Sequence, residues 1–135
     1  MKLTRRYHFS ASHRLDTPAL SPEANRELYG KCNNPHGHGH NYVLDVTVAG
    51  MPDESGQIAS RAELDAAVNA RVLSKIDHRN LNTEVAALGG AVPTTENLAI
   101  AIEASLAEGW PLKARLDRVR IWETERNLFE LESTR

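Results

Sequence analysis

Hydrophobic and polar residues alternate in four stretches of the chain, two in each half. The first stretch, residues 2–15, places apolar side chains and His13 on one face and mostly charged or hydroxyl side chains on the other. Residues 41–50, 115–123 and 127–133 alternate in the same way. Because successive side chains of an extended segment point to opposite faces, this pattern predicts four strands that each bury one face. The first strand delivers His13 close to its end.

Helical periodicity occupies the middle of the chain. The spacing Ser60-x-x-Glu63 is typical of a helix N-terminus, where both side chains satisfy free backbone N–H groups. After it, apolar residues recur at every fourth position, namely Leu64, Val68, Val72 and Ile76. A second helix is expected to begin at residues 93–96 and to end at Gly109-Trp110-Pro111. Residues 16–30 carry two prolines and predict a loop with one short helical turn around residues 22–28.

The element order ββααββ predicts an α+β fold. Two hairpins around a helical pair imply a four-stranded antiparallel sheet with both helices on one face. A length of 135 residues, with 41% hydrophobic and 25% charged residues, is that of one globular domain covering residues 1–135. Aromatic residues make up only 5% of this short chain, so one subunit buries a modest core. We therefore expect a homo-oligomer.

Charge and composition exclude several classes of partner. The formal net charge of −2 and the sequence pI near 6.3 give no basic surplus for non-specific binding to nucleic acid. No apolar run is long enough to span a membrane or to form a signal sequence. The single cysteine cannot form an intrachain disulfide, which agrees with a reducing compartment. These features predict a cytoplasmic protein with a small-molecule substrate.

Residues 31–42 carry the candidate chemistry, because they hold the only cysteine, Cys32, and three of the six histidines. His38 and His40 lie two positions apart on an extended segment, so their imidazoles share one face and can chelate a metal. A catalytic zinc needs a third protein ligand, for which His13 is the best candidate. One cysteine cannot build a zinc finger, so a metal here would be catalytic. The competing interpretation is a surface cluster of histidines that binds nothing.

At this point the motifs resemble one family, the 6-pyruvoyl-tetrahydropterin synthases together with the 6-carboxy-tetrahydropterin synthases. The resemblance runs nearly from end to end and implies a tunnelling fold, in which the sheets of three subunits close into a barrel and two trimers stack into a hexamer. It also implies active sites between subunits. The motifs that carry it are Phe9-Ser10-Ala11-Ser12-His13-Arg14-Leu15, Gly30 to Pro35, Gly37 to Tyr42, Leu73 through Asp77-His78 to Asn82, Thr94-Thr95-Glu96-Asn97 and Trp122-Glu123-Thr124.

The resemblance also assigns roles to individual residues. It implies that a zinc ion binds three histidines, that one cysteine is catalytic and that an Asp-His pair relays protons. A glutamate is implied to anchor the pterin, and a Thr-Thr-Glu segment to line the pterin pocket. On this sequence the zinc ligands are His13, His38 and His40, the catalytic residues are Cys32, Asp77 and His78, and the substrate-binding residues are Glu123, Thr94, Thr95 and Glu96.

The implied reaction is that of a carbon–oxygen lyase, which converts 7,8-dihydroneopterin triphosphate to 6-pyruvoyl-tetrahydropterin and eliminates triphosphate. Zinc would acidify the substrate's side-chain hydroxyls. Cys32 would act as the base, with its pKa lowered by the metal, by His78 or by another positive group. Mg²⁺ would accompany the triphosphate. The cations available to hold the triphosphate are Lys31, Arg14, Arg79 and Arg126, and the sequence does not choose among them.

Two other functions stay open. The chain could make 6-carboxy-5,6,7,8-tetrahydropterin for the deazapurine (queuosine) pathway, or it could be a non-enzymatic pterin- or zinc-binding module. Cys32 beside the histidines favours an enzyme, because binding alone needs no base. Five residues separate Cys32 from His38, a spacing that resembles the pyruvoyl-forming enzymes. If His36 and His38 formed the chelating pair instead, the spacing would be the shorter one of the carboxy-forming relatives.

Overall fold

A computed structural model describes residues 1–134 of the chain. Its helices are α1 (Pro22–Tyr29), α2 (Arg61–Val68), α3 (Ser74–Ile76) and α4 (Thr95–Ala107). Its strands are β1 (Lys2–His13), β2 (His38–Ala49), β3 (Arg79–Asn80), β4 (Arg115–Trp122) and β5 (Leu128–Glu132). Two 3₁₀ turns, η1 (Gly30–Asn33) and η3 (Ala86–Leu88), and one π-helical turn, η2 (Asn69–Leu73), complete the described elements.

The sheet has the strand order β3-β1-β2-β4-β5. The predicted four-stranded antiparallel sheet is therefore wrong in one respect: the two-residue strand β3 adds parallel to β1 and makes the sheet mixed and five-stranded. A strand this short leaves no alternation to find in the sequence. The other four strands are antiparallel, as predicted, and β2 begins at His38 because the ladder with β1 continues until His13 lies opposite His38.

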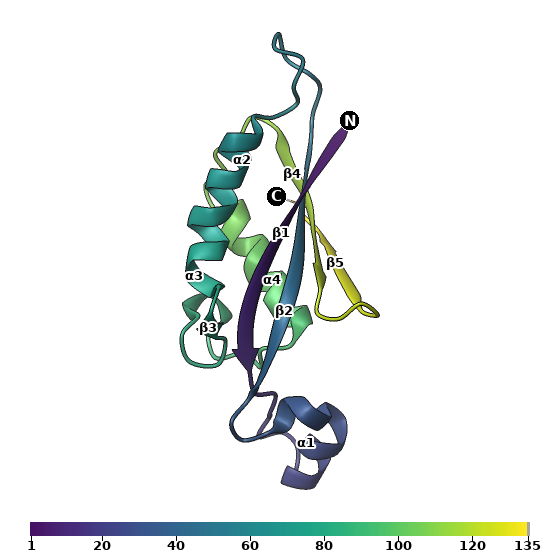
Figure 1. Cartoon of the computed structure of the whole chain (residues 1–135), viewed down its shortest axis with the longest axis vertical. Coiled ribbons are helices and arrows are strands. Elements are labelled where there is room, and N and C mark those ends of the chain that lie inside the picture. Colours follow the sequence, from purple (N-terminus) through teal and green to yellow (C-terminus); the bar gives the residue numbers. More distant parts are fainter. Residues whose placement is uncertain (135) are drawn as a thin grey trace.

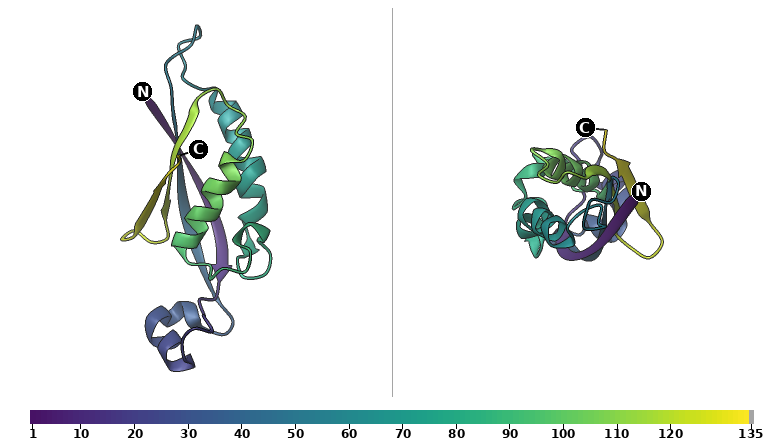
Figure 2. Two further views of the ribbon diagram at one scale, coloured as in Figure 1. Left: turned by 180° about the vertical axis from the view of Figure 1, so that it is seen from behind. Right: turned by 90° about the horizontal axis from the view of Figure 1, so that it is seen from above.

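The helices α2, α3 and α4 pack against one face of the sheet, and α1 lies beyond the end of the β1–β2 hairpin (Figure 1). The view from behind in Figure 2 shows the same layers. Two helical units on one face were predicted, whereas α1 is a full helix in place of the expected single turn. It is capped by the Ser21 side chain, which accepts a hydrogen bond from the Ala24 N–H, and Pro22 stands at its first turn.

The predicted cap at Ser60 and the predicted apolar stripe are present, and Thr94 caps the second helix within the expected start at residues 93–96. The Ser60 hydroxyl accepts a hydrogen bond from the Glu63 N–H, and the Thr94 hydroxyl accepts one from the Asn97 N–H. The stripe formed by Leu64, Val68, Val72 and Ile76 is buried against the sheet. The helix that carries it is interrupted by the π-helical turn η2, which the four-residue spacing did not predict.

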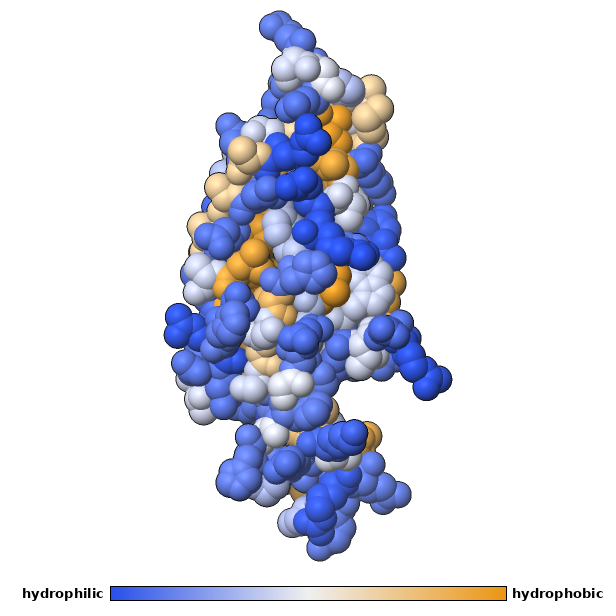
Figure 3. Space-filling model, in the orientation of Figure 1, coloured by the Kyte–Doolittle hydropathy of each residue, from blue (hydrophilic) through white to orange (hydrophobic). Residues whose placement is uncertain are grey.

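The described surface is polar around α1, and hydrophobic residues reach it mainly in patches along the sheet and the helices (Figure 3). None of the helices in residues 1–134 is both long and apolar enough to cross a membrane. The helices pack over the inner face of β1 and β2 along most of its length. The histidine-bearing end of the two strands lies where this core stops.

Candidate metal centre

The end of the β1–β2 hairpin collects the three histidines singled out in the sequence. His13 is the last residue of β1 and lies directly opposite His38, the first residue of β2. Directly paired residues project to the same face, and His40 follows two positions later on that face. The ring centroids of His13 and His40 lie 4.8 Å apart, and those of His38 and His40 lie 4.6 Å apart. The predicted shared face is confirmed.

Gly37 lets the chain enter β2 so close to β1. Its φ is +81°, in the region that favours glycine, and a Cβ placed on it would lie 3.1 Å from the His13 carbonyl oxygen. A side chain here would be strained at this φ and would require the His13 carbonyl to shift by a few tenths of an ångström. Gly39, in contrast, has open space at the Cβ position within the chain.

Four side chains bring potential ligand atoms together at this end of the sheet. The ligand atoms of His13, Cys32, His40 and Glu123 all lie within 4.8 Å of one another. His40 Nε2 is central, because it lies 3.0 Å from His13 Nε2, 3.2 Å from Glu123 Oε1 and 3.6 Å from Cys32 Sγ. Cys32 comes from the 3₁₀ turn η1, and Glu123 directly follows β4. Sequence motifs suggested all four residues, but not that Glu123 adjoins the histidines.

The tautomer of His13 is set by a neighbour outside the cluster. His13 Nδ1 lies 2.9 Å from the Pro93 carbonyl oxygen. A carbonyl oxygen only accepts hydrogen bonds, so Nδ1 carries the proton and donates it. This leaves the Nε2 lone pair of His13 free and aimed at His40, which is how proteins orient a metal-binding imidazole.

The donors and acceptors around His40 do not balance. Two acceptor atoms, His13 Nε2 and Glu123 Oε1, face His40 Nε2, which can offer one proton at most, and the Cys32 thiol lies beside them. A divalent cation satisfies several such lone pairs at once. Two nitrogens on a tetrahedral zinc lie roughly 3.3 Å apart for Zn–N bonds of about 2.0–2.1 Å, close to the 3.0 Å between the two Nε2 atoms. The donor set therefore fits a zinc ion.

The surroundings favour neutral imidazoles and a protonated thiol. Burial lowers the pKa of both His13 and His40, so both offer lone pairs at neutral pH. Burial raises the pKa of the Cys32 thiol, and the Glu123 charge raises it further. The chain's own groups thus do not activate the thiol, and the expected lowering of this pKa by His78 is not found. Any activation of Cys32 within this chain falls to a bound cation.

His38 and His36 lie outside the four-atom group. His38 is partly buried and packs its ring edge-on against His40, so its role as the third zinc ligand stays a prediction. His36 is exposed. Since His40 belongs to the cluster, the geometry favours the pair His38 and His40 over the pair His36 and His38.

The predicted relay residues Asp77 and His78 do pair, with 3.0 Å between Asp77 Oδ1 and His78 Nδ1. The same carboxylate oxygen accepts a hydrogen bond from the Ser10 N–H at 3.0 Å. His78 has a φ of +60°, uncommon for a residue with a side chain, and its side chain is 81% exposed. Within residues 1–134 no hydrogen bond or ion pair joins this dyad to the metal cluster. An open groove lined by both His78 and His40 lies between them.

The predicted pterin-binding segment directly follows a residue that contacts the cluster. Pro93, whose carbonyl holds His13, directly precedes Thr94, the N-cap of α4. Thr95 is buried, its hydroxyl has no partner among residues 1–134, and Glu96 is exposed.

Tyr42 ends one of the sequence motifs, but no role was assigned to it. It is buried next to the cluster, with its ring centroid 5.6 Å from that of His40. Burial raises the pKa of its hydroxyl, and the charges of Glu123 and Cys32 raise it further. Its position two residues after His40, on the same strand face, was the available signal.

The four candidate triphosphate ligands differ in their present partners. Arg14 lies 3.7 Å from Asp16, and Arg79 lies 3.7 Å from Glu84. Lys31 and Arg126 are exposed and make no side-chain ion pair within the described residues. Among residues 1–134, none of the four side chains makes a hydrogen bond or an ion pair to His13, Cys32, His40 or Glu123.

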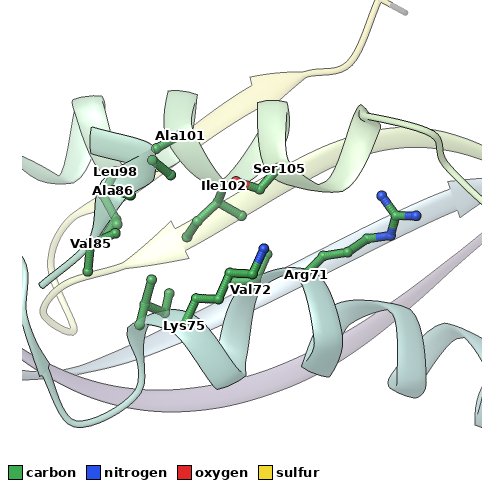
Figure 4. Close-up of a pocket in the computed structure, with 11 residues that line it drawn as sticks. Arg71, Val72, Lys75, Val85, Ala86, Leu98, Ala101, Ile102 and Ser105 are labelled. Carbon is green, nitrogen blue, oxygen red and sulfur yellow. The ribbon is translucent and has the colours of Figure 1, made fainter. Parts of the chain in front are cut away.

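A separate groove lies between the helices. Figure 4 shows Val72, Leu98 and Ile102 among its apolar lining, with Arg71 and Lys75 at its edge. None of the predicted site residues lines it. The chemistry-bearing residues therefore belong to the sheet end and not to this groove.

Comparison with known proteins points to one family. A family model described as 6-pyruvoyl tetrahydropterin synthase matches residues 2–134. A 6-pyruvoyl tetrahydrobiopterin synthase from Dictyostelium discoideum is 46% identical over 126 residues, which cover 93% of this chain and 90% of that protein. The solved structure of Caenorhabditis elegans 6-pyruvoyl tetrahydropterin synthase superposes with a TM-score of 0.90 at 38% identity, covering 99% of this chain and 96% of that one. A putative 6-carboxy-5,6,7,8-tetrahydropterin synthase from Archaeoglobus fulgidus is 35% identical over 94 residues, 70% of this chain and 74% of that protein.

Proposed function

Because the chain belongs to the 6-pyruvoyl tetrahydropterin synthase family, we propose that it is a zinc-dependent lyase. Its substrate is 7,8-dihydroneopterin triphosphate, its product is 6-pyruvoyl-tetrahydropterin, and triphosphate is eliminated. The observation that carries this proposal is the cluster around His40 Nε2, where two acceptor atoms face one proton at most and the Cys32 thiol lies 3.6 Å away. A thiol and a carboxylate beside two imidazoles can supply a base and a hydrogen-bond acceptor next to a bound metal ion.

The proposed zinc ligands are His13, His38 and His40. His13 Nδ1 is already committed to the Pro93 carbonyl, so its Nε2 is ready to bind. His38 lies opposite His13 in the ladder and beside His40, and zinc binding would require its ring to turn toward the other two. Three neutral ligands leave zinc its full charge, with which it would acidify the substrate's side-chain hydroxyls.

Cys32 is the proposed base. Its Sγ lies within the four-atom group, so a substrate bound there has the thiol within reach of its side-chain carbons. Transfer of a carbon-bound proton to the thiolate and its return to a neighbouring carbon moves the oxidation state along the side chain without a redox cofactor. Glu123, at the edge of the same group, accepts the pterin's 2-amino and ring N–H groups, the paired donors that a carboxylate matches. Thr94, Thr95 and Glu96 line the pocket.

The relay dyad Asp77–His78 is proposed to serve the centre of a neighbouring subunit. Within one chain it is exposed and makes no bond to the cluster. The sheet also has two open edges, because β3 covers only Ala11 and Ser12 of β1, and β5 pairs only with β4. Open edges favour pairing between chains. We propose that the sheets of three subunits close into a barrel and that two such trimers form a hexamer.

The triphosphate is proposed to carry Mg²⁺, a hard cation that prefers phosphate oxygens. Lys31 is the best-placed of the four candidate cations in this chain, because it precedes Cys32 directly and has no competing carboxylate within the described residues.

Product analysis tests this function. Enzyme loaded with zinc is incubated with Mg²⁺ and 7,8-dihydroneopterin triphosphate, and the quenched mixture is analysed by mass spectrometry. We expect 6-pyruvoyl-tetrahydropterin and one triphosphate per substrate consumed. A 6-carboxy pterin with stoichiometric acetaldehyde would assign the sister activity, and tight pterin binding without turnover would assign a non-enzymatic module.

A further inference from the structure

Tyr42 carries a buried hydroxyl without a hydrogen-bond partner in residues 1–134. The residue is 1% exposed. Its ring stacks on Phe9 with the centroids 4.9 Å apart and an interplanar angle of 12°. A ring held in this way does not turn toward solvent, and an unpartnered buried hydroxyl is unfavourable. The fold thus keeps a donor in its interior that it does not use.

The strand register places this donor beside Glu123. The last pair of the β2–β4 ladder is Val43 with Trp122, so one step further along the antiparallel strands lie Tyr42 and Glu123. Alternation turns both side chains toward the inner face, where His40 also lies. The Glu123 side chain is 16% exposed, which leaves its carboxylate few solvent contacts.

Glu123 Oε1 lies 3.2 Å from His40 Nε2, the nearest nitrogen that can donate a hydrogen bond to it. Nε2 of His40 can bind a cation only through its lone pair, so it must give up its proton when a metal enters. His13 Nε2, 3.9 Å from the same oxygen, carries no proton either, because that ring donates through Nδ1. Metal binding therefore removes the donor that Glu123 uses.

We propose that Tyr42 supplies the replacement: once a divalent cation binds the histidines, the Tyr42 hydroxyl donates a hydrogen bond to the Glu123 carboxylate and holds it in position for the pterin. The inference rests on the zinc-dependent function proposed above. Tyr42 is a positioning residue, since it acts on the substrate through Glu123. With a metal bound, the Tyr42 hydroxyl and the Glu123 carboxylate would be hydrogen-bond partners. Without it, the Tyr42 hydroxyl has no acceptor among residues 1–134.

The test uses Tyr42→Phe, which removes only the hydroxyl. Two dissociation constants are measured: that of zinc, by competition with a chromophoric chelator, and that of 7,8-dihydroneopterin on the zinc-loaded protein, by calorimetry. Because loss of a group that orients a neighbour of a metal weakens binding roughly 10-fold or more, we expect both constants to rise by about that factor. The melting temperature of the metal-free protein should stay equal or rise, because an unused buried hydroxyl is removed.

Tyr7→Phe is the matched control, because the Tyr7 hydroxyl already donates to Asp65 Oδ1 at 2.7 Å. That variant should melt at a lower temperature and bind zinc and 7,8-dihydroneopterin as the parent does. A double-mutant cycle with Glu123→Ala isolates the coupling, since Tyr42→Phe should have no further effect on either constant when the carboxylate is absent.

Unchanged zinc and 7,8-dihydroneopterin constants in Tyr42→Phe would overturn the proposal, as would a lower melting temperature of its metal-free form, which would show that the hydroxyl is already bonded. If the parent protein binds zinc but no 7,8-dihydroneopterin, the proposed function fails while the zinc constants still test the role of Tyr42.

Discussion

Two polar clusters lie along the inner face of β1, and they differ in how their donors and acceptors match. In the first, Asp65 accepts two hydrogen bonds from Arg5, at 3.1 and 2.6 Å, and one from Tyr7 at 2.7 Å. In the second, two acceptor atoms, from His13 and Glu123, face a single nitrogen of His40, with the Cys32 thiol beside them.

This difference in matching of donors and acceptors indicates that the Asp65 cluster stabilises the fold, whereas the His40 cluster is suited to binding a ligand. The Asp65 cluster is complete within the chain, so its contribution is to stability. The His40 cluster has more acceptors than protons within the chain, and the proposed cation would satisfy them. Variants in the two clusters should accordingly change different measurements.

The largest effect is expected from the zinc ligands. His13→Ala and His38→Ala should each weaken zinc binding by more than the roughly 10–100-fold typical of residues that only orient a ligand. Zinc per chain, measured by elemental analysis after dialysis, should fall close to zero. His36→Ala is the control, because His36 is exposed and outside the cluster. If His36→Ala lost zinc while His13→Ala kept it, the ligand set would be wrong.

A smaller loss, confined to chemistry, is expected from Cys32→Ala. The variant should keep zinc and bind 7,8-dihydroneopterin, while kcat falls by about 10²-fold or more, the scale of a positioned acid or base. Stopped assays of triphosphate release measure it. Turnover within a few-fold of the parent would remove Cys32 from the mechanism.

A variant of the Asp65 cluster should lower stability and leave zinc binding and turnover unchanged. Asp65→Asn removes the charge that Arg5 and Tyr7 share, so the melting temperature should fall by a few degrees, a modest change because the Asp65 side chain is 40% exposed. Zinc content and kcat should match the parent. A variant that loses zinc or turnover without losing stability would break the distinction between the clusters.

The smallest expected effect is that the two clusters change the stability of the fold in different pH ranges. Buried His13 and His40 have pKa values lowered from 6.5, so the unfolded chain binds more protons than the folded chain just below that pH. The metal-free protein should therefore lose stability as pH falls below about 6.5. The pKa of Asp65 is lowered from 3.8 by Arg5, so its contribution is present above that pH and is lost as pH falls through the folded-state value. Denaturant titrations at several pH values should show both windows in the parent, and only the upper one in Asp65→Asn.

Local sequence rules predicted the parts of the fold that depend on neighbours in the chain. Alternation found the four antiparallel strands, the Ser60-x-x-Glu63 spacing found one helix cap, and the second helix was expected to begin at residues 93–96, where Thr94 caps it. The strand β3 was missed because its two residues join the sheet through a parallel pairing with β1, which depends on where the preceding helix ends.

The candidate site was predicted in its residues more than in its arrangement. His13 and His40 share a face because of strand alternation, which the sequence displays. That Glu123 meets them depends on the β2–β4 register, and the exposed position of His78 depends on the pairing of β3 with β1 after α3. Register and chain path are tertiary properties, so no motif recorded them.

The proposal that the His40 cluster binds a metal ion needed for turnover is tested most directly by reconstitution. Enzyme stripped with a chelator is titrated with zinc, and the initial rate of triphosphate release from 7,8-dihydroneopterin triphosphate is measured at each step. We predict almost no turnover without metal and a linear rise that ends at one zinc per chain. Full turnover in the stripped enzyme, or a rise that ends far from one zinc per chain, would contradict the account.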